Sequence, residues 1–83
     1  MFRIFFHRVA EKKFSRLDKP TQRRISKAID AISINPYLGT ALQGALKGSH
    51  RIRVGDFRVI YEIIAKEQTV LIHAIGSRGD IYK

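Results

Sequence analysis

The chain has 83 residues, of which 45% are hydrophobic and 28% are charged, a composition typical of one small folded domain and not of a disordered segment. It contains no cysteine, which excludes a disulfide framework and a thiolate metal site and favours the cytoplasm. Sixteen lysines and arginines against seven acidic residues give a net charge of +9. Such a charge either attracts a polyanion (nucleic acid, an acidic protein or an anionic membrane surface) or forms a solvated basic surface, and composition alone does not decide between them.

The first half of the chain predicts one strand and two helices. Residues Phe2–Phe6 are aromatic or β-branched at close spacing and predict a strand; this apolar run is too short for a membrane span or a signal peptide, so we expect no membrane attachment. Apolar residues then recur at helical spacing over Arg8–Leu17. A second helix is expected from Pro20, which suits a first helical turn, to about Ile34, where Asn35-Pro36 ends it.

The second half predicts a loop followed by three strands. Residues Pro36–Lys47 have no clean period and are assigned mostly to loop. Strands are expected over Ser49–Val54 and Phe57–Ile64, joined by a two-residue turn at Gly55-Asp56. The third strand, Thr69–Gly76, is apolar on both predicted faces and is therefore expected to be central. Alternation places Val70, Ile72 and Ala74 on one of its faces and Leu71 and Ile75 on the other.

The order strand, two helices, three strands predicts a single α+β domain over residues 1–83, with both helices packed on one side of a small, mostly antiparallel sheet. The helices carry basic residues on their outward faces, which are Lys12, Lys13, Arg16, Arg23, Arg24 and Lys27. The polar tail, Ser77–Lys83, follows the last strand.

The two-residue turn also predicts which side chains share a face of the hairpin. It sets Arg53 directly opposite Arg58, and side-chain alternation brings Arg51 to the same face. The other face is expected to be the core face, with His50, Ile52, Val54, Phe57, Val59, Tyr61 and Ile63. Opposed like charges destabilise a sheet, so their presence favours a functional anion site. Alternatively, the arginines splay apart into water or Glu62 partly neutralises them.

Guanidinium groups suit a phosphodiester because their planar donors match phosphate oxygens. Cleaving RNA without a metal needs a base, an acid and cations for the developing charge. The seven acidic residues are scattered singly and no nucleotide-binding motif occurs, so neither a metal site nor a cofactor is expected. Among the histidines, His50 falls on the core face, His7 ends the first strand, and His73 lies mid-strand as a structural residue. No pair of histidines that could serve as acid and base is predicted.

Two segments of the sequence resemble a known family. They are RIRVGDFRVIYEI at residues 51–63 and IGSRGDIY at residues 75–82, and they are similar to the C-terminal half of the RelE/ParE toxin superfamily, in its RelE-like mRNA interferase branch. The preceding strand and helices resemble its N-terminal half. The resemblance implies the toxin of a type II toxin–antitoxin system, a ribosome-dependent endoribonuclease that cuts messenger RNA by metal-independent attack of the 2′-hydroxyl. It also implies a cognate antitoxin as partner.

The resemblance assigns roles to individual residues. It implies that Arg51 and Arg53 bind RNA and help to organise the reacting groups, and that Arg58 stabilises the phosphate. It further implies that Arg78 stabilises the phosphate or donates a proton, and that Tyr82 stacks on the substrate or acts as base. The basic residues of the two helices, with Arg51 and Arg53, would contact RNA. Arginines replace the lysines of some relatives at Arg51 and Arg53, and an arginine cannot readily serve as base.

One further departure lies at Ser77, where many relatives place a histidine or lysine, so one basic contact is missing. Two other functions compete with the ribonuclease. The ParE branch shares the fold and poisons DNA gyrase, although its members generally lack the full set of arginines and tyrosine. A non-catalytic, basic nucleic-acid-binding module would use the cations of the helices alone.

Overall fold

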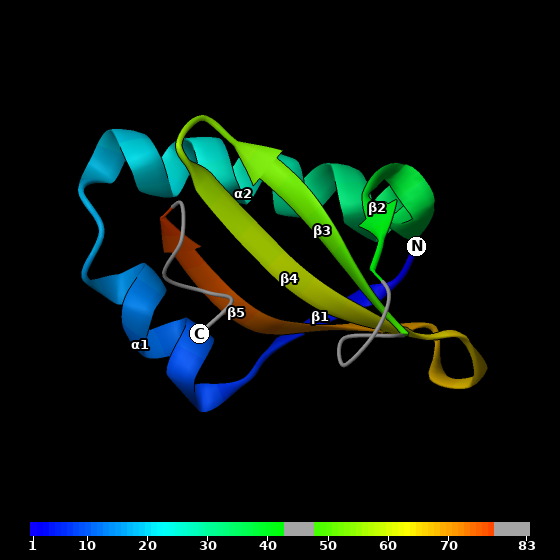
Figure 1. Ribbon diagram of the computed structural model, residues 1–83. Coiled ribbons are helices and arrows are strands. Elements are labelled where there is room, and N and C mark those ends of the chain that lie inside the picture. The colour runs from blue at the N-terminus through cyan, green and yellow to red at the C-terminus, as the bar shows by residue number, and fades with distance from the viewer. Residues whose placement is uncertain (43–47, 78–83) are drawn as a thin grey trace.

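The computed structural model, which describes residues 1–42 and 48–77, contains one mixed sheet of five strands with two helices on one face (Figure 1). The helices are α1 (Arg8–Ser15) and α2 (Lys19–Ile34), and the strands are β1 (Arg3–Phe6), β2 (Thr40–Ala41), β3 (Ser49–Val54), β4 (Phe57–Ile64) and β5 (Thr69–Ser77). Two short 3₁₀ turns complete the described elements, η1 (Pro36–Leu38) and η3 (Ala65–Glu67).

The strand order is β1-β5-β4-β3-β2. Strand β1 pairs with β5 in parallel, and all other neighbours in the described sheet are antiparallel. The α+β architecture predicted from the sequence is therefore confirmed, with β5 in the interior of the sheet as expected. No helix among the described residues is long and apolar enough to span a membrane.

The core lies between the helices and one face of the sheet. Its buried members are Ala10 of α1, Ile25, Ile29 and Ile32 of α2, and Val59, Tyr61, Val70, Ile72 and Ile75 of the sheet. Helix α2 can present this apolar stripe because its start and end are well defined. Asp18 is its N-cap, Pro20 occupies its first turn, and Asn35 ends it. The hydroxyl of Thr21 hydrogen-bonds to Asp18 and lowers the pKa of that carboxyl.

The β3–β4 hairpin has the predicted register. Val54 pairs with Phe57 and Arg53 with Arg58, so the turn consists of Gly55 and Asp56. Gly55 has a φ of 61°, a left-handed conformation that glycine adopts without a steric penalty. The hairpin face that was expected to meet the helices does so, because Val59 and Tyr61 are fully buried in the core.

Strand β5 departs from simple alternation. Ile60 pairs with Ala74 and the next residue, Tyr61, pairs with Ile72, so His73 is an extra residue in a β-bulge. The bulge shifts the pattern of faces along the strand. Ile75 consequently joins Val70 and Ile72 in the core, and the prediction that it shares a face with Leu71 was wrong.

The segment after α2 is more ordered than the predicted loop. It contains η1 and β2, and the buried side chain of Tyr61 holds it against the sheet. The Tyr61 hydroxyl donates to the carbonyl of Pro36 at 2.6 Å and accepts from the backbone N–H of Gly39 at 3.1 Å. A Cβ at Gly39 would lie 2.6 Å from the carbonyl oxygen of Arg51, so only glycine fits this approach. The remainder of the predicted loop, residues 43–47, lies outside the described residues.

Candidate functional site

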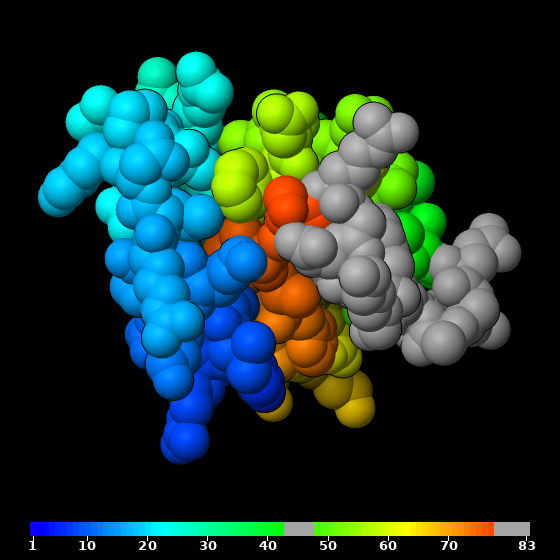
Figure 2. All heavy atoms as spheres, turned by 60° about the vertical axis from the view of Figure 1, so that its left-hand side comes forward, coloured from blue at the N-terminus to red at the C-terminus, as the bar shows by residue number. Residues whose placement is uncertain are grey.

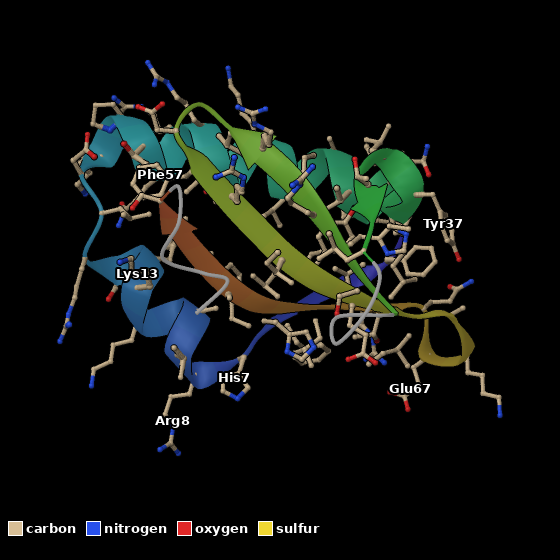
Figure 3. All side chains as sticks on the ribbon, in the orientation of Figure 1. His7, Arg8, Lys13, Tyr37, Phe57 and Glu67 are labelled. Atoms are coloured by element: carbon tan, nitrogen blue, oxygen red, sulfur yellow. The ribbon has the colours of Figure 1, made fainter. Side chains whose placement is uncertain are left out.

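The three arginines of the hairpin gather on the sheet face that the helices leave open. Arg53 and Arg58 are direct cross-strand partners, and Arg51 lies opposite Ile60, one row further along the hairpin. On its other side Arg58 pairs with Gly76 of β5. Because Gly76 has no side chain, that side of Arg58 presents only backbone. We call Arg51, Arg53 and Arg58 the arginine face; Figure 3 shows side chains with nitrogen atoms (blue) along the β3–β4 hairpin.

Arg53 and Arg58 carry charge that no carboxylate among the described residues neutralises. In the part of the chain that the structure describes, no carboxylate lies within ion-pair distance of Arg53 or Arg58. The Nε of Arg58 is buried and has no hydrogen-bond partner among these residues. A buried donor without a partner is uncommon in folded proteins and is satisfied when an acceptor binds. The site can therefore accept an anion such as a phosphate.

Glu62 does not neutralise the pair formed by Arg53 and Arg58. Its Oε1 lies 2.9 Å from Nε2 of His73, which makes this carboxylate the partner of an imidazole. Among the three possibilities raised by the sequence, an anion site on the arginine face agrees best with this arrangement.

The six basic residues predicted to face outward are exposed: Lys12 and Lys13 on α1, Arg16 directly after it, and Arg23, Arg24 and Lys27 on α2. Those of α2, together with Pro20, line an open depression on the helix surface. The guanidinium of Arg24 reaches the β3–β4 turn, where its Nη1 lies 4.0 Å from the position of a Cβ on Gly55. In Figure 2 the N-terminal half of α2 (cyan) appears beside that turn (yellow-green). The cations of α2 thus adjoin the tip of the hairpin that carries the arginine face.

Two residues that the sequence assigned to the site, Arg78 and Tyr82, lie outside the described residues. Their roles stay predictions. Within the described ranges, no group of three histidine, aspartate or glutamate side chains is placed to hold a metal ion.

The histidines differ from the sequence-based expectation. His50 lies on the core face as predicted, with its ring 5.7 Å from that of Tyr61. The rings of His7 and His73, however, stack with centroids 6.4 Å apart and an interplanar angle of 29°, a contact that the sequence did not predict. His73 is also not enclosed in the sheet, since 38% of its side chain is exposed. The bulge is responsible, and no local sequence signal indicates it.

A comparison with models of known protein families shows to which family the chain belongs. A family model described as the ParE toxin of the type II toxin–antitoxin system parDE matches residues 4–82. The chain belongs to this toxin family. The ParE-family match covers both segments on which the resemblance to the RelE/ParE superfamily was based, and that resemblance is confirmed.

Solved structures place this ParE-family toxin among RelE-like folds. The isolated RelE toxin of E. coli is similar with a TM-score of 0.85 at 18% identity, over 99% of this chain and 92% of that chain. A chain of the RelBE2 toxin–antitoxin complex of Mycobacterium tuberculosis is similar with a TM-score of 0.84 at 24% identity, over 93% of this chain and 98% of that chain. A chain of the archaeal RelE–RelB complex of Pyrococcus horikoshii is similar with a TM-score of 0.81 at 28% identity, over 95% of this chain and 97% of that chain. No curated protein sequence matches this chain.

Proposed function

We propose that this toxin is a ribosome-dependent, metal-independent endoribonuclease that cleaves messenger RNA by attack of a 2′-hydroxyl on the adjacent phosphate. The observation that supports this most strongly is the arginine face, where Arg53 and Arg58 are direct neighbours and the buried Nε of Arg58 has no acceptor among the described residues. A pentavalent phosphate carries more negative charge than the ground state, so preorganised cations stabilise the transition state.

The arginines supply charge and orientation but not proton transfer. Their guanidinium groups stay protonated, so Arg51, Arg53 and Arg58 bind the phosphate and hold the scissile bond in place. Arg78 is proposed as a further phosphate contact or proton donor, and Tyr82 as the base or as a stacking residue. A tyrosine is a weak base at neutral pH, but neighbouring cations lower the pKa of a phenol and favour its phenolate.

The basic helices are proposed to bind ribosomal RNA. The six cations that the sequence assigns to RNA binding are exposed, and those of α2 lie beside the hairpin that carries the arginine face. Contacts of this kind supply affinity without reading sequence, because they are made to phosphates. Binding to the ribosome would then bring the arginine face to the message.

A cognate antitoxin is the proposed protein partner. The structures from M. tuberculosis and P. horikoshii are toxin–antitoxin complexes, and this chain covers nearly the whole length of the matched chains. With a net charge of +9, the toxin would attract an antitoxin segment rich in acidic residues.

DNA gyrase inhibition is the second candidate function. It is favoured by the family model, which is described as a ParE toxin. The directly opposed arginines favour the ribonuclease, because a toxin that only binds a protein surface has no need for a phosphate site on its open sheet face.

Inducible expression in growing cells that lack the antitoxin separates the two functions. RNA ends are mapped and DNA breaks are counted in parallel, for the wild type, for Arg58→Ala and for the control Lys66→Ala, which removes an exposed lysine of η3, outside both helices and the arginine face. We expect message cleavage phased to the reading frame for the wild type and the control, and its loss in Arg58→Ala. DNA breaks with intact messages would instead establish gyrase as the target.

A further inference from the structure

The bulge in β5 places a histidine on the same face of the sheet as the arginines. His73 is the unpaired extra residue between Ile72 and Ala74, and its Nε2 lies 2.9 Å from Oε1 of Glu62. Glu62 shares the open face with Arg58, because the two are four residues apart on β4. Bulges often re-aim a side chain beside a functional site. Here the bulge brings an imidazole onto the open face, and Glu62 fixes the orientation of the ring.

A second imidazole extends this surface. The parallel register of β1 and β5 ends with Phe6 beside Ile72, so the next residue, His7, lies beside His73 and stacks on it. Its backbone N–H continues the ladder by donating to the carbonyl of Ile72 at 2.8 Å. Its Nδ1 accepts from the N–H of Val9 at the start of α1. Two independent sets of hydrogen bonds therefore hold the stacked rings in place.

An aromatic ring adjoins the histidine pair. Phe5 pairs with Leu71, which pairs in turn with Glu62, so Phe5 also lies on the open face. It is 52% exposed, whereas its neighbours Ile4 and Phe6 pack against the core. The guanidinium carbon of Arg3 lies 5.9 Å from the Phe5 ring centroid and adds a cation to the surface.

This aromatic surface lies close to the arginine face. His73 precedes Gly76, the partner of Arg58, by three positions on β5, which corresponds to about 10 Å along the strand. A short stretch of single-stranded RNA spans that distance. Unstacked bases of single-stranded RNA are commonly bound by stacking on phenylalanine or histidine rings.

We propose that Phe5, His7 and His73 form a nucleobase platform, on which a base next to the cleaved phosphate stacks while that phosphate lies on the arginine face. The ligand class is an unstacked nucleobase of the RNA substrate, so the proposal rests on the ribonuclease function. The platform adds a binding subsite for bases to a site that otherwise contacts only phosphates.

Nuclear magnetic resonance of the purified toxin tests whether a base is bound there. The toxin is titrated with adenosine monophosphate and, as matched control, with ribose 5-phosphate, which has the same phosphate and sugar but no base. We expect the ring protons of Phe5, His7 and His73 to shift upfield with adenosine monophosphate and to stay in place with ribose 5-phosphate. Equal shifts with both ligands, or shifts with neither, would overturn the proposal.

Substitutions test the same surface with an uncleavable 2′-O-methyl oligoribonucleotide. Phe5→Ala and His73→Ala should each weaken its binding about fivefold or more, since one base stacked on an aromatic ring is worth that much. His73→Phe keeps a ring and should restore most of the affinity. The control is Ile34→Ala, which removes an apolar side chain that is 71% exposed at the end of α2, away from the platform, and should bind like the wild type.

The outcomes separate this proposal from the function on which it rests. A toxin that cleaves messages but shows no base-dependent shift contradicts the platform alone. Base-dependent shifts in a protein that cleaves no RNA support the platform and contradict the ribonuclease. Platform variants that bind the oligonucleotide normally but lose antitoxin binding would make this surface a protein contact and overturn the proposal.

Discussion

Arg53 and Arg58 occupy facing positions at which a sheet is more stable with opposite or uncharged side chains. The buried Nε of Arg58 adds a second local conflict, because it has no acceptor within the described residues. A stable fold alone requires neither feature. Both are removed when a phosphate binds between the guanidinium groups, so the residues that weaken the free toxin are those that we expect to bind the substrate.

Replacing Arg53 by glutamine should therefore stabilise the folded protein and weaken its binding of the substrate. Arg53→Gln removes the opposed charge, and we expect the free energy of unfolding to rise by a few tenths of a kcal/mol to about 1 kcal/mol. Urea denaturation at low salt measures this change. Lys66→Gln, an exposed substitution with the same change in net charge, should have a smaller effect. A decrease in stability for Arg53→Gln would show that the two arginines do not repel each other.

The C-terminal residues of the proposed site also give a prediction. Arg78→Ala should lower the cleavage rate by about 10²–10³, the usual effect of removing one preorganised charge stabiliser. Tyr82→Phe keeps the ring and removes the hydroxyl. We expect this variant to lose cleavage rate while it still binds ribosomes, as measured by cosedimentation and single-turnover cleavage. An unchanged rate would assign Tyr82 to stacking.

At the scale of whole elements, the sequence was most informative where local chemistry sets the structure. The Gly55-Asp56 turn fixes its own length, and the turn fixes the register of β3 and β4, so the faces of Arg51, Arg53 and Arg58 followed from the sequence alone. The start and end of α2 were equally clear, because Pro20 and Asn35-Pro36 mark them. Each of these features depends on residues close together in the chain.

The sequence did not predict those features that depend on contacts between residues far apart in the chain. The bulge at His73 arises from pairing between β4 and β5, and the same alternating sequence is compatible with an unbulged strand. The parallel contact of β1 with β5, which brings His7 to His73, joins opposite ends of the chain. Strand β2 was assigned to loop because its order comes from Tyr61 and from pairing with β3. The placement of Arg78 and Tyr82 lies outside the described residues.

Tyr61 anchors the segment between α2 and β2, and its removal gives a test of stability. Tyr61→Phe loses two hydrogen bonds and leaves the N–H of Gly39 without its partner, so we expect a loss of about 1–3 kcal/mol in the free energy of unfolding. Tyr37→Phe, which removes the hydroxyl of an exposed ring, is the matched control and should change stability little. Equal stability of both variants in urea denaturation would contradict the anchoring role.

The buried phenol of Tyr61 also predicts how the stability of the fold depends on pH. Burial raises the pKa of Tyr61 above its ordinary value of 10.0, so the folded state favours the neutral phenol. The stabilisation is complete below pH 10 and is lost as the pH rises through the folded-state pKa. The stability of the wild type should therefore fall more steeply above pH 10 than that of Tyr61→Phe. Parallel slopes in denaturation series from pH 8 to about 11 would contradict this.

At the scale of the whole molecule, the dominant property is a net charge of +9 on 83 residues, with exposed cations on both helices and arginines on the open sheet face. If these groups bind RNA phosphates, affinity must fall as salt rises, with a log–log slope of about −0.7 for each single-strand contact. Fluorescence anisotropy with an uncleavable oligoribonucleotide across a salt series gives the slope. A slope near zero would mean that the charge does not serve nucleic-acid binding.

The central claim is that the arginine face cleaves messenger RNA, and its most direct test is single-turnover cleavage by purified toxin on ribosomes programmed with a defined message. Arg58→Ala should cleave about 10²–10³ times more slowly than the wild type, while the control Lys66→Ala should keep the wild-type rate. Circular dichroism confirms that each variant is folded. Full cleavage activity in folded Arg58→Ala would contradict the ribonuclease assignment. The assignment would also be contradicted if the wild type cleaves no message on ribosomes but is fully toxic in cells.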